Sequence, residues 1–156
     1  MRSGVIIETA IWRDLSVLIS LEKTCFGRDA WPWIDCLAAL TFPEIVRLKA
    51  VFEGRTIGFV IGDRRRREDL GWIASIGVHP DFRRQGIGRT LLLTCERQLA
   101  LPRLRLTLRD SNRVARSLYQ HCGYVKVDVW TQYYSDGEHG IVMEKTVGEH
   151  ENLKTT

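Results

Sequence analysis

One short segment of the chain combines residue types that suit the binding of a phosphate group. Residues 83–89 read Arg83, Arg84, Gln85, Gly86, Ile87, Gly88 and Arg89. The segment follows a run of β-branched residues and precedes an apolar run, so the pattern predicts a strand, a tight loop and a helix. Free backbone N–H groups and the helix dipole favour an anion at such a helix start. A match this short is equally typical of a Gly-rich surface turn with solvated arginines.

Two common nucleotide-binding motifs do not fit this segment. A G-x-G-x-x-G fingerprint would need a third glycine where Leu91 stands, and the Lys-Ser/Thr pair of a P-loop is missing. Neither nucleotide-binding motif therefore accounts for this segment.

A second segment, residues 112–124, places two polar side chains on one face of a predicted helix. Asn112 and Tyr119 are seven residues apart, so two helical turns bring them to the same side. A tyrosine with an ordinary pKa of ~10 is protonated at neutral pH and can donate a proton or a hydrogen bond. The alternative is that Tyr119 only packs in the core.

Together the two segments resemble the GNAT superfamily of acyl-CoA N-acyltransferases. Residues 83–88 match the family signature R/Q-x-x-G-x-G/A, which grips the pyrophosphate of CoA. Residues 112–124 match the segment N-x-x-A-x-x-L-Y-x-x-x-G-F, with Tyr124 in place of Phe. The resemblance extends over residues 5–145. It is greatest to the RimI-type enzymes, which acetylate the N-terminal alanine of a small-subunit ribosomal protein.

The resemblance implies an α/β GNAT fold. Its sheet is central, mixed, mostly antiparallel and twisted, with about seven strands that splay between strands four and five and about four flanking helices. It implies acetyl-CoA as cosubstrate and no metal. The Val78 N–H would donate to the oxyanion, and Tyr119 would face the leaving sulfur. The residues that the resemblance assigns to the cofactor are Ile76, Val78, Arg83, Arg84, Gln85, Gly86, Ile87, Gly88, Arg89 and Asn112.

The sequence departs from the RimI-type pattern at the general base. Those enzymes carry a glutamate five residues before the Asn, where this chain has Thr107, whose hydroxyl could hold a water but cannot act as a base. Glu138 is the first candidate for the missing base, because it also matches a family position. The other titratable candidates are His79, Asp110 and His139. All four have plain structural alternatives as turn, cap or hairpin-tip residues.

Three functions remain open on these grounds. The first is an acetyl-CoA-dependent N-acetyltransferase acting on a protein N-terminal α-amine, possibly ribosomal. The second is an acetyltransferase for a small-molecule amine such as a polyamine or an antibiotic. The third is a CoA-binding regulatory module that has lost its base.

Composition agrees with a single domain, which we expect to cover residues 1–148 before a polar tail at 149–156. The 156 residues carry a formal charge of +4, which selects no partner. No apolar run is long enough for a signal peptide or a membrane span. The four scattered cysteines have no C-x-x-C pair and favour a reduced, cytoplasmic protein. Monomer and homodimer both remain possible.

Hydrophobic periodicity predicts the elements that must position these residues. Strands are expected at 5–8, 49–53, 56–61, 71–78, 104–108, 124–129 and 140–145, and helices at 15–26, 32–40, 88–100 and 114–122. Asp14 and residues 110–112 are expected to cap helices, and Gly54 with Arg55 to form a two-residue hairpin turn. Residues 135–137 are expected to form the last turn.

Three features have a plain and a functional interpretation. Trp31 and Trp33 are expected to be core anchors rather than substrate contacts. The four arginines at 64–67 are expected to form a solvated loop, because no aromatic residues are interleaved to favour nucleic acid. Gly77 is expected to permit a bulge that turns the Val78 N–H inward.

Overall fold

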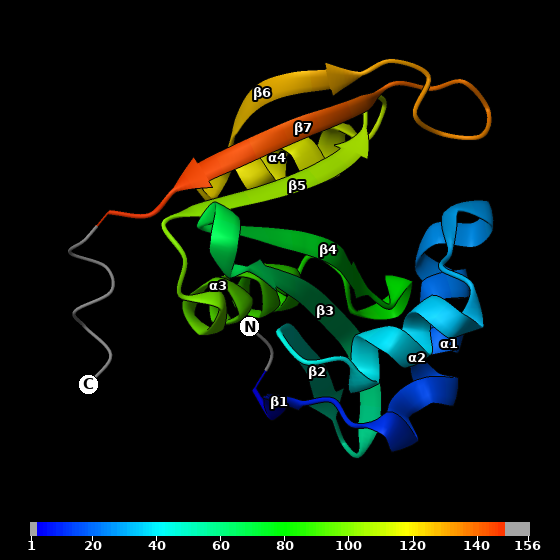
Figure 1. The fold of residues 1–156 in the computed structure, drawn as a ribbon. Coiled ribbons are helices and arrows are strands. Elements are labelled where there is room, and N and C mark those ends of the chain that lie inside the picture. The colour runs from blue at the N-terminus through cyan, green and yellow to red at the C-terminus, as the bar shows by residue number, and fades with distance from the viewer. Residues whose placement is uncertain (1–2, 149–156) are drawn as a thin grey trace.

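In a computed structural model that describes residues 3–148, a twisted sheet of seven strands separates two pairs of helices (Figure 1). The strand order is β1-β2-β3-β4-β5-β7-β6, and only the β4–β5 pair is parallel. The strands are β1 (Val5–Thr9), β2 (Ile45–Phe52), β3 (Arg55–Arg65), β4 (Leu70–Val78), β5 (Arg103–Arg109), β6 (Val125–Trp130) and β7 (Gly140–Thr146).

Four α-helices cover the sheet, two on each face (Figure 1). They are α1 (Leu15–Phe26), α2 (Trp33–Thr41), α3 (Ile87–Leu99) and α4 (Arg113–His121). Short 3-10 turns, η1 (Trp12–Asp14), η2 (Gly27–Asp29), η3 (Arg66–Glu68) and η4 (Pro80–Phe82), join the elements. Within residues 3–148, no helix combines the length and apolar character that a membrane span requires. The seven predicted strands and four predicted helices are confirmed, but β2 begins four residues earlier and β3 ends four residues later than predicted.

The two faces of the sheet bury separate apolar clusters. Leu104, Leu106 and Leu108 of β5 share the larger cluster with α3 and α4, as the alternation of leucines predicts. Phe59 and Ile61 of β3 point to the other face, where α1 and α2 cover them. The sheet is thus held rigid from both sides, which fixes the position of β4 and β5 relative to the helices.

The sheet divides at its centre. Only Leu70, Gly71 and Trp72 of β4 pair with β5, and beyond Trp72 the two strands diverge. The β3–β4 register shifts between Ile61 and Gly62, which leaves Ala74 as an extra residue in β4. A bulge of this kind bends its strand. The predicted splay between strands four and five is therefore confirmed.

Two turn and cap predictions need correction. The β2–β3 hairpin turns at Glu53 and Gly54, one residue earlier than predicted, because both adopt the positive φ that a type I′ turn requires. Asp14 precedes α1 as predicted, but it does not cap that helix. Its carboxylate instead accepts hydrogen bonds from the Ile11 N–H at 2.8 Å and from Lys49 Nζ at 2.9 Å.

The predictions at the remaining helix ends largely agree with the structure. Asn112 caps α4 by accepting a hydrogen bond from the Ala115 N–H at 3.2 Å. Gly123 follows α4 with φ of 98°. Pro32, predicted inside the first turn of α2, is the residue just before it. The turn expected at 135–137 lies at the tip of the β6–β7 loop, where the Gly137 N–H donates to the Tyr134 carbonyl.

The tryptophans and the arginine run differ from their expected roles. Trp31 packs against the smaller core cluster, but Trp33 is 60% exposed and is not a core anchor. Arg64 and Arg65 belong to β3, and Arg66 and Arg67 to η3. Arg64 donates to the Gln98 carbonyl at 2.7 Å, so the run is partly tied to the end of α3. The polar tail at 149–156 lies outside the described residues.

Candidate active site

The edge of β4 carries backbone donors that β5 does not reach. The His79 N–H donates to the Ile57 carbonyl at 2.7 Å. Bonded and non-bonded pairs alternate along an antiparallel ladder, so the N–H groups of Ile76 and Val78 point away from β3. They face the side where pairing with β5 has ended. This edge can take the amide groups of an extended ligand as an added strand would.

Gly77 serves this edge through packing rather than through the predicted bulge, which lies at Ala74. A Cβ on Gly77 would lie 2.9 Å from Cys25 Sγ and 3.1 Å from the Phe59 ring. The absence of a side chain therefore lets α1 approach β4. Cys25 Sγ in turn donates to the Val78 carbonyl at 3.5 Å, which steadies the strand end.

The predicted phosphate loop continues from this edge to the start of α3. Arg84 and Gly86 have φ of 60° and 79°, the left-handed conformation that turns the chain sharply. Gly86 is the residue before α3, and Gly88 lies in its first turn. The residue before α3 is a glycine, so no N-cap side chain accepts a hydrogen bond from that helix start. The N–H groups there are available for an anion.

Some side chains of the loop contact the rest of the protein, whereas others are exposed to solvent. Arg83 Nε donates to the Val78 carbonyl at 2.9 Å, so the guanidinium of Arg83 braces the β4 edge. Ile87 is 1% exposed and belongs to the core, which leaves only its backbone for a ligand. Arg84 and Arg89 are exposed. Gln85 Oε1 is buried and has no hydrogen-bond partner within residues 3–148.

A cleft of about 770 Å³ opens where β4 and β5 diverge. The structure brings Ile76, Asn112 and Tyr119 together in this cleft, as the sequence predicts. Val78 and residues 83–89 do not line this cleft, but Arg83 bonds to the Val78 carbonyl and Gly88 lies next to the Val78 side chain. The remaining walls come from residues 72–75, 106–109 and 133–135, together with Glu22, Phe26, Asp29, Trp31, Asp63, Arg65, Ala115 and Trp130.

Tyr119 lines the cleft and belongs to the larger apolar cluster. Its side chain is 8% exposed and meets the Tyr124 ring edge-on at 6.0 Å between centroids. Burial raises the pKa of Tyr119 well above its usual range. The hydroxyl is therefore a hydrogen-bond donor at neutral pH rather than a group that gives up its proton readily.

Glu22 is a buried carboxylate in the cleft that the sequence analysis missed. It is 1% exposed and accepts hydrogen bonds from Ser75 Oγ at 2.6 Å and from the Trp31 N–H at 3.1 Å. Burial raises the pKa of Glu22, and the two hydrogen bonds oppose part of that rise. No described Lys, Arg or His forms an ion pair with it. A signal was present, because Glu22 lies four residues after Leu18 and four before Phe26, on the apolar stripe of α1.

Glu138, the first candidate for the base, is held in an ion pair outside the cleft lining. It accepts from Arg109 Nη1 at 2.8 Å and from the Ser111 N–H at 2.7 Å. These contacts, first that with Ser111 and then that with Arg109, hold the pKa of Glu138 below its usual range. A carboxylate with a lowered pKa is a weaker base, so this environment does not favour the predicted role.

The other three titratable candidates also lie outside the cleft lining. His79 Nδ1 accepts from the Asp81 N–H at 3.2 Å, which makes it the cap of η4. His139 Nδ1 accepts from the Gln132 N–H at 2.9 Å. Asp110 is exposed and lies 3.7 Å from Arg116. Thr107 does line the cleft, and its buried hydroxyl has no partner among the described residues.

No group of three or more His, Cys, Asp or Glu side chains within residues 3–148 is arranged to hold a metal ion. The four cysteines are free, and Cys36, Cys95 and Cys122 are buried. The polar groups of the site are therefore backbone N–H groups and hydroxyls, which can donate hydrogen bonds, and the buried carboxylate of Glu22, which accepts them. These groups fit a thioester cosubstrate with an amide-containing arm and a phosphate end.

Relatives of known sequence and structure share this layout. The chain is 34% identical over 137 residues to an N-acetyltransferase of Methanocaldococcus jannaschii, covering 85% of this chain and 86% of that protein. It is 31% identical over 132 residues to an acetyltransferase of Pectobacterium atrosepticum, covering 80% and 92% of the two chains.

Solved structures agree with the same fold. A ribosomal-protein-alanine N-acetyltransferase from Escherichia coli superposes with a TM-score of 0.82 at 25% identity, covering 93% of this chain and 97% of that one. Nourseothricin acetyltransferase superposes with a TM-score of 0.77 at 20% identity, covering 94% and 100%. The acetyltransferase (GNAT) family model matches residues 12–124. The chain belongs to the GNAT acetyltransferase family, and it is an acyltransferase that uses acetyl-CoA.

Proposed function

We propose that this protein transfers the acetyl group of acetyl-CoA to the free α-amine of a protein N-terminus, with Glu22 as the general base. The observation that supports this most is the position of Glu22. A buried carboxylate with a raised pKa lies in the same cleft as Tyr119 and the free β4 edge. Buried carboxyl groups of this kind are how enzymes place a base close to neutral pH.

The cofactor residues divide the work of binding. The N–H groups of Ile76 and Val78 pair with the pantetheine amides or the thioester oxygen, and the start of α3 receives the pyrophosphate through the N–H groups that follow Gly86. Arg84 and Arg89 add positive charge around that site. Arg83 acts through the Val78 carbonyl that it braces. Asn112, whose Oδ1 is used by the helix cap, keeps its amide nitrogen for the cofactor.

Besides binding the cofactor, the site must accept a proton from the amine, stabilise the negative oxygen and stabilise the leaving thiolate. Acetyl-CoA supplies an activated acyl group as a thioester. Glu22 takes the proton as the amine nitrogen bonds to the acetyl carbon, and the Val78 N–H donates to the oxygen that becomes negative. As the carbon–sulfur bond breaks, Tyr119 donates a hydrogen bond to the departing thiolate. Its raised pKa makes full proton transfer unfavourable, so the hydrogen bond is the contribution we assign to it.

An α-amine suits this machinery better than a lysine side chain. An α-amine of pKa ~8 costs about 1.4 kcal/mol to deprotonate at pH 7, whereas a lysine of pKa ~10.4 costs between about 4 and 5 kcal/mol. A single carboxylate base can therefore deprotonate an α-amine more easily than a lysine side chain. Both a ribosomal-protein-alanine acetyltransferase and a nourseothricin acetyltransferase share the fold, so a small-molecule amine is the alternative to test.

The test is a transfer assay with labelled acetyl-CoA and a matched set of acceptors. The set contains peptides with a free N-terminus and no lysine, the same peptides blocked at the N-terminus and carrying an internal lysine, polyamines, and an aminoglycoside. We expect the free N-termini to be acetylated fastest. Faster transfer to lysine or to a small amine would contradict the proposal. CoA binding without transfer to any acceptor would favour a regulatory module.

A further inference from the structure

Arg109, the last residue of β5, is the centre of an ion-pair network at the edge of the cleft. Its Nε and Nη2 donate to the two carboxylate oxygens of Asp29 at 2.6 and 2.8 Å. Its Nη1 donates to Asp136 at 2.9 Å and to Glu138 at 2.8 Å. The guanidinium also lies 4.3 Å from the centroid of the Tyr134 ring. One side chain therefore satisfies three carboxylates and one aromatic ring.

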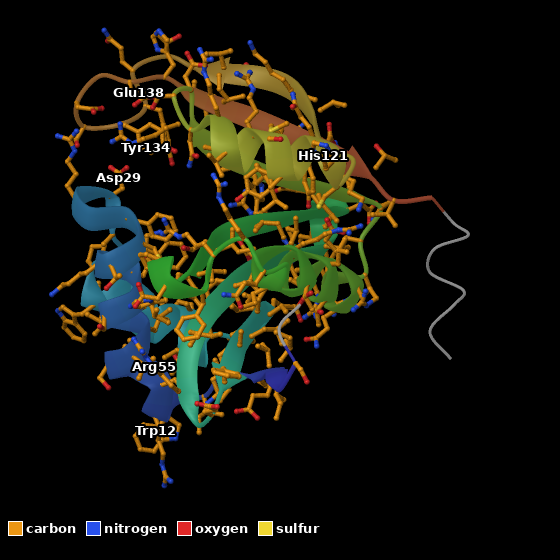
Figure 2. All side chains as sticks on the ribbon, turned by 180° about the vertical axis from the view of Figure 1, so that it is seen from behind. Trp12, Asp29, Arg55, His121, Tyr134 and Glu138 are labelled. Atoms are coloured by element: carbon orange, nitrogen blue, oxygen red, sulfur yellow. The ribbon has the colours of Figure 1, made fainter. Side chains whose placement is uncertain are left out.

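These partners come from segments that are far apart in the sequence. Asp29 belongs to η2 between α1 and α2, whereas Tyr134, Asp136 and Glu138 belong to the β6–β7 loop. In Figure 2, Asp29 at the end of the α1–α2 layer faces Tyr134 and Glu138 on the loop above it. Arg109 joins the two segments from the strand between them. Arg109, Asp29 and Tyr134 all line the cleft.

The network is more than a set of surface ion pairs. Exposed pairs contribute little, but the Arg109 side chain is only 17% exposed and its contact with Asp29 is bidentate. The guanidinium holds the pKa of Asp29 below its usual range and contributes to the lowered pKa of Asp136 and Glu138. All three carboxylates therefore stay ionised and paired at the pH of the reaction.

We propose that Arg109 is a positioning residue for the acceptor. It ties the α1–α2 turn to the β6–β7 loop, so that Asp29 and the Tyr134 ring are held where the acceptor enters the cleft. The network contains three carboxylates, those of Asp29, Asp136 and Glu138, and two arginines. The second arginine, Arg28, pairs with Asp136 at 3.0 Å. One negative charge is left over at this opening, which suits an amine that arrives as a cation. The inference rests on the proposed transferase function and assigns this end of the cleft to the acceptor.

The first test compares Arg109→Gln and Arg109→Lys with wild type, using the peptide that wild type acetylates fastest. We expect Arg109→Gln to raise KM for the peptide by about tenfold or more, with a smaller change in kcat. Arg109→Lys should give an intermediate KM, because lysine keeps the charge but loses the bidentate geometry. CoA affinity, measured by calorimetry, should remain within about twofold.

Arg105→Gln is the matched control, because Arg105 lies four residues earlier on the same face of β5 and pairs with Glu144 instead. It should leave KM for the peptide unchanged. Peptide KM within twofold of wild type in Arg109→Gln would overturn the inference. Equal losses of peptide and CoA affinity in that variant would overturn it as well, since they indicate a general structural role.

A second test needs no acceptor and uses a milder change. Asp29→Asn removes one partner at a partly exposed site, and hydrogen exchange followed by mass spectrometry reports on residues 131–139. We expect faster exchange there and unchanged exchange in α3. Unchanged exchange in the loop would contradict the inference. This test does not depend on the Arg109 variants, so it remains valid if those variants do not fold. Absence of transfer to any peptide by wild type would instead contradict the proposed function.

Discussion

Two carboxylates near the site have opposite environments, and this contrast decides between them. Burial raises the pKa of Glu22 overall, although its hydrogen bonds with Ser75 and the Trp31 N–H oppose part of that rise. Glu138 is bound to the Ser111 N–H and Arg109, which lowers its pKa. A general base must hold a proton during the reaction and release it afterwards. The raised pKa of Glu22 suits that task, whereas the ion pair of Glu138 opposes it.

Glu22→Gln tests this assignment with little change in shape. We expect kcat to fall about 10²-fold or more, while CoA affinity is retained. In wild type, kcat/KM should rise with pH first through the raised pKa of Glu22 and then through the pKa of the peptide amine. The variant should keep only the second rise. Activity within a factor of two of wild type, measured across the pH range, would show that Glu22 has a structural role only.

Tyr119→Phe tests the hydrogen bond to the leaving sulfur. The side chain is nearly fully buried and touches Tyr124, so removing one oxygen keeps the packing. We expect kcat to fall by about 10²-fold and KM for acetyl-CoA to change little. Steady-state kinetics at several acetyl-CoA concentrations separates the two. An unchanged kcat would assign Tyr119 to the core alone.

At the scale of elements, the start of α3 is the part of the site that the sequence predicts most directly. Gly86 has φ of 79°, a conformation that Asn and Asp tolerate better than other residues with a side chain. Both would also cap the helix. Gly86→Asp and Gly86→Asn therefore differ mainly in charge. We expect the aspartate variant to bind CoA far more weakly than the asparagine variant, by calorimetry. Equal affinities would show that no phosphate lies at this helix start.

Sequence patterns predict elements well here because local signals and tertiary packing agree. The alternating leucines of β5, the Asn112 cap and Gly123 after α4 all behave as their residue types require. The bulge at Ala74 was not predictable, because register depends on the neighbouring strand rather than on local residue types. Glu22 was missed for a similar reason, since only the fold shows that Ser75 and the Trp31 N–H surround it.

At the scale of the whole molecule, the two ends of the site carry opposite charge. Arg84 and Arg89 are exposed at the end that we propose binds the cofactor, whereas Asp29, Asp136 and Glu138 surround Arg109 at the other end. This arrangement suits an anionic cofactor at one end and a cationic amine at the other. The sequence predicts the first half from its arginines and glycines. The negative end could not be predicted from the sequence, because the α1–α2 turn and the β6–β7 loop are far apart in the chain and come together only in the folded protein (Figure 1).

The same charges predict how stability depends on pH. Glu22 has a raised pKa in the folded state, so its contribution is fully present below the ordinary value of 4.5 and is lost as pH rises through the raised pKa. Asp29, Asp136 and Glu138 have lowered pKa values, so their contribution is present above their ordinary values of 3.8 to 4.5 and is lost as pH falls through the lowered ones.

We therefore expect the free energy of unfolding, measured with urea at a series of pH values, to rise as pH falls from neutrality and to drop steeply below about pH 4. Glu22→Gln should remove the rise and be more stable than wild type at pH 7, because it no longer buries a charge. Arg109→Gln should be less stable at pH 7 but show a shallower acid drop, since its three carboxylates return toward ordinary pKa values. A Glu22→Gln protein less stable than wild type at pH 7 would mean that the ionised carboxylate is well satisfied by Ser75 and Trp31. The pKa of Glu22 would then not be raised, and the main support for Glu22 as the general base would be lost.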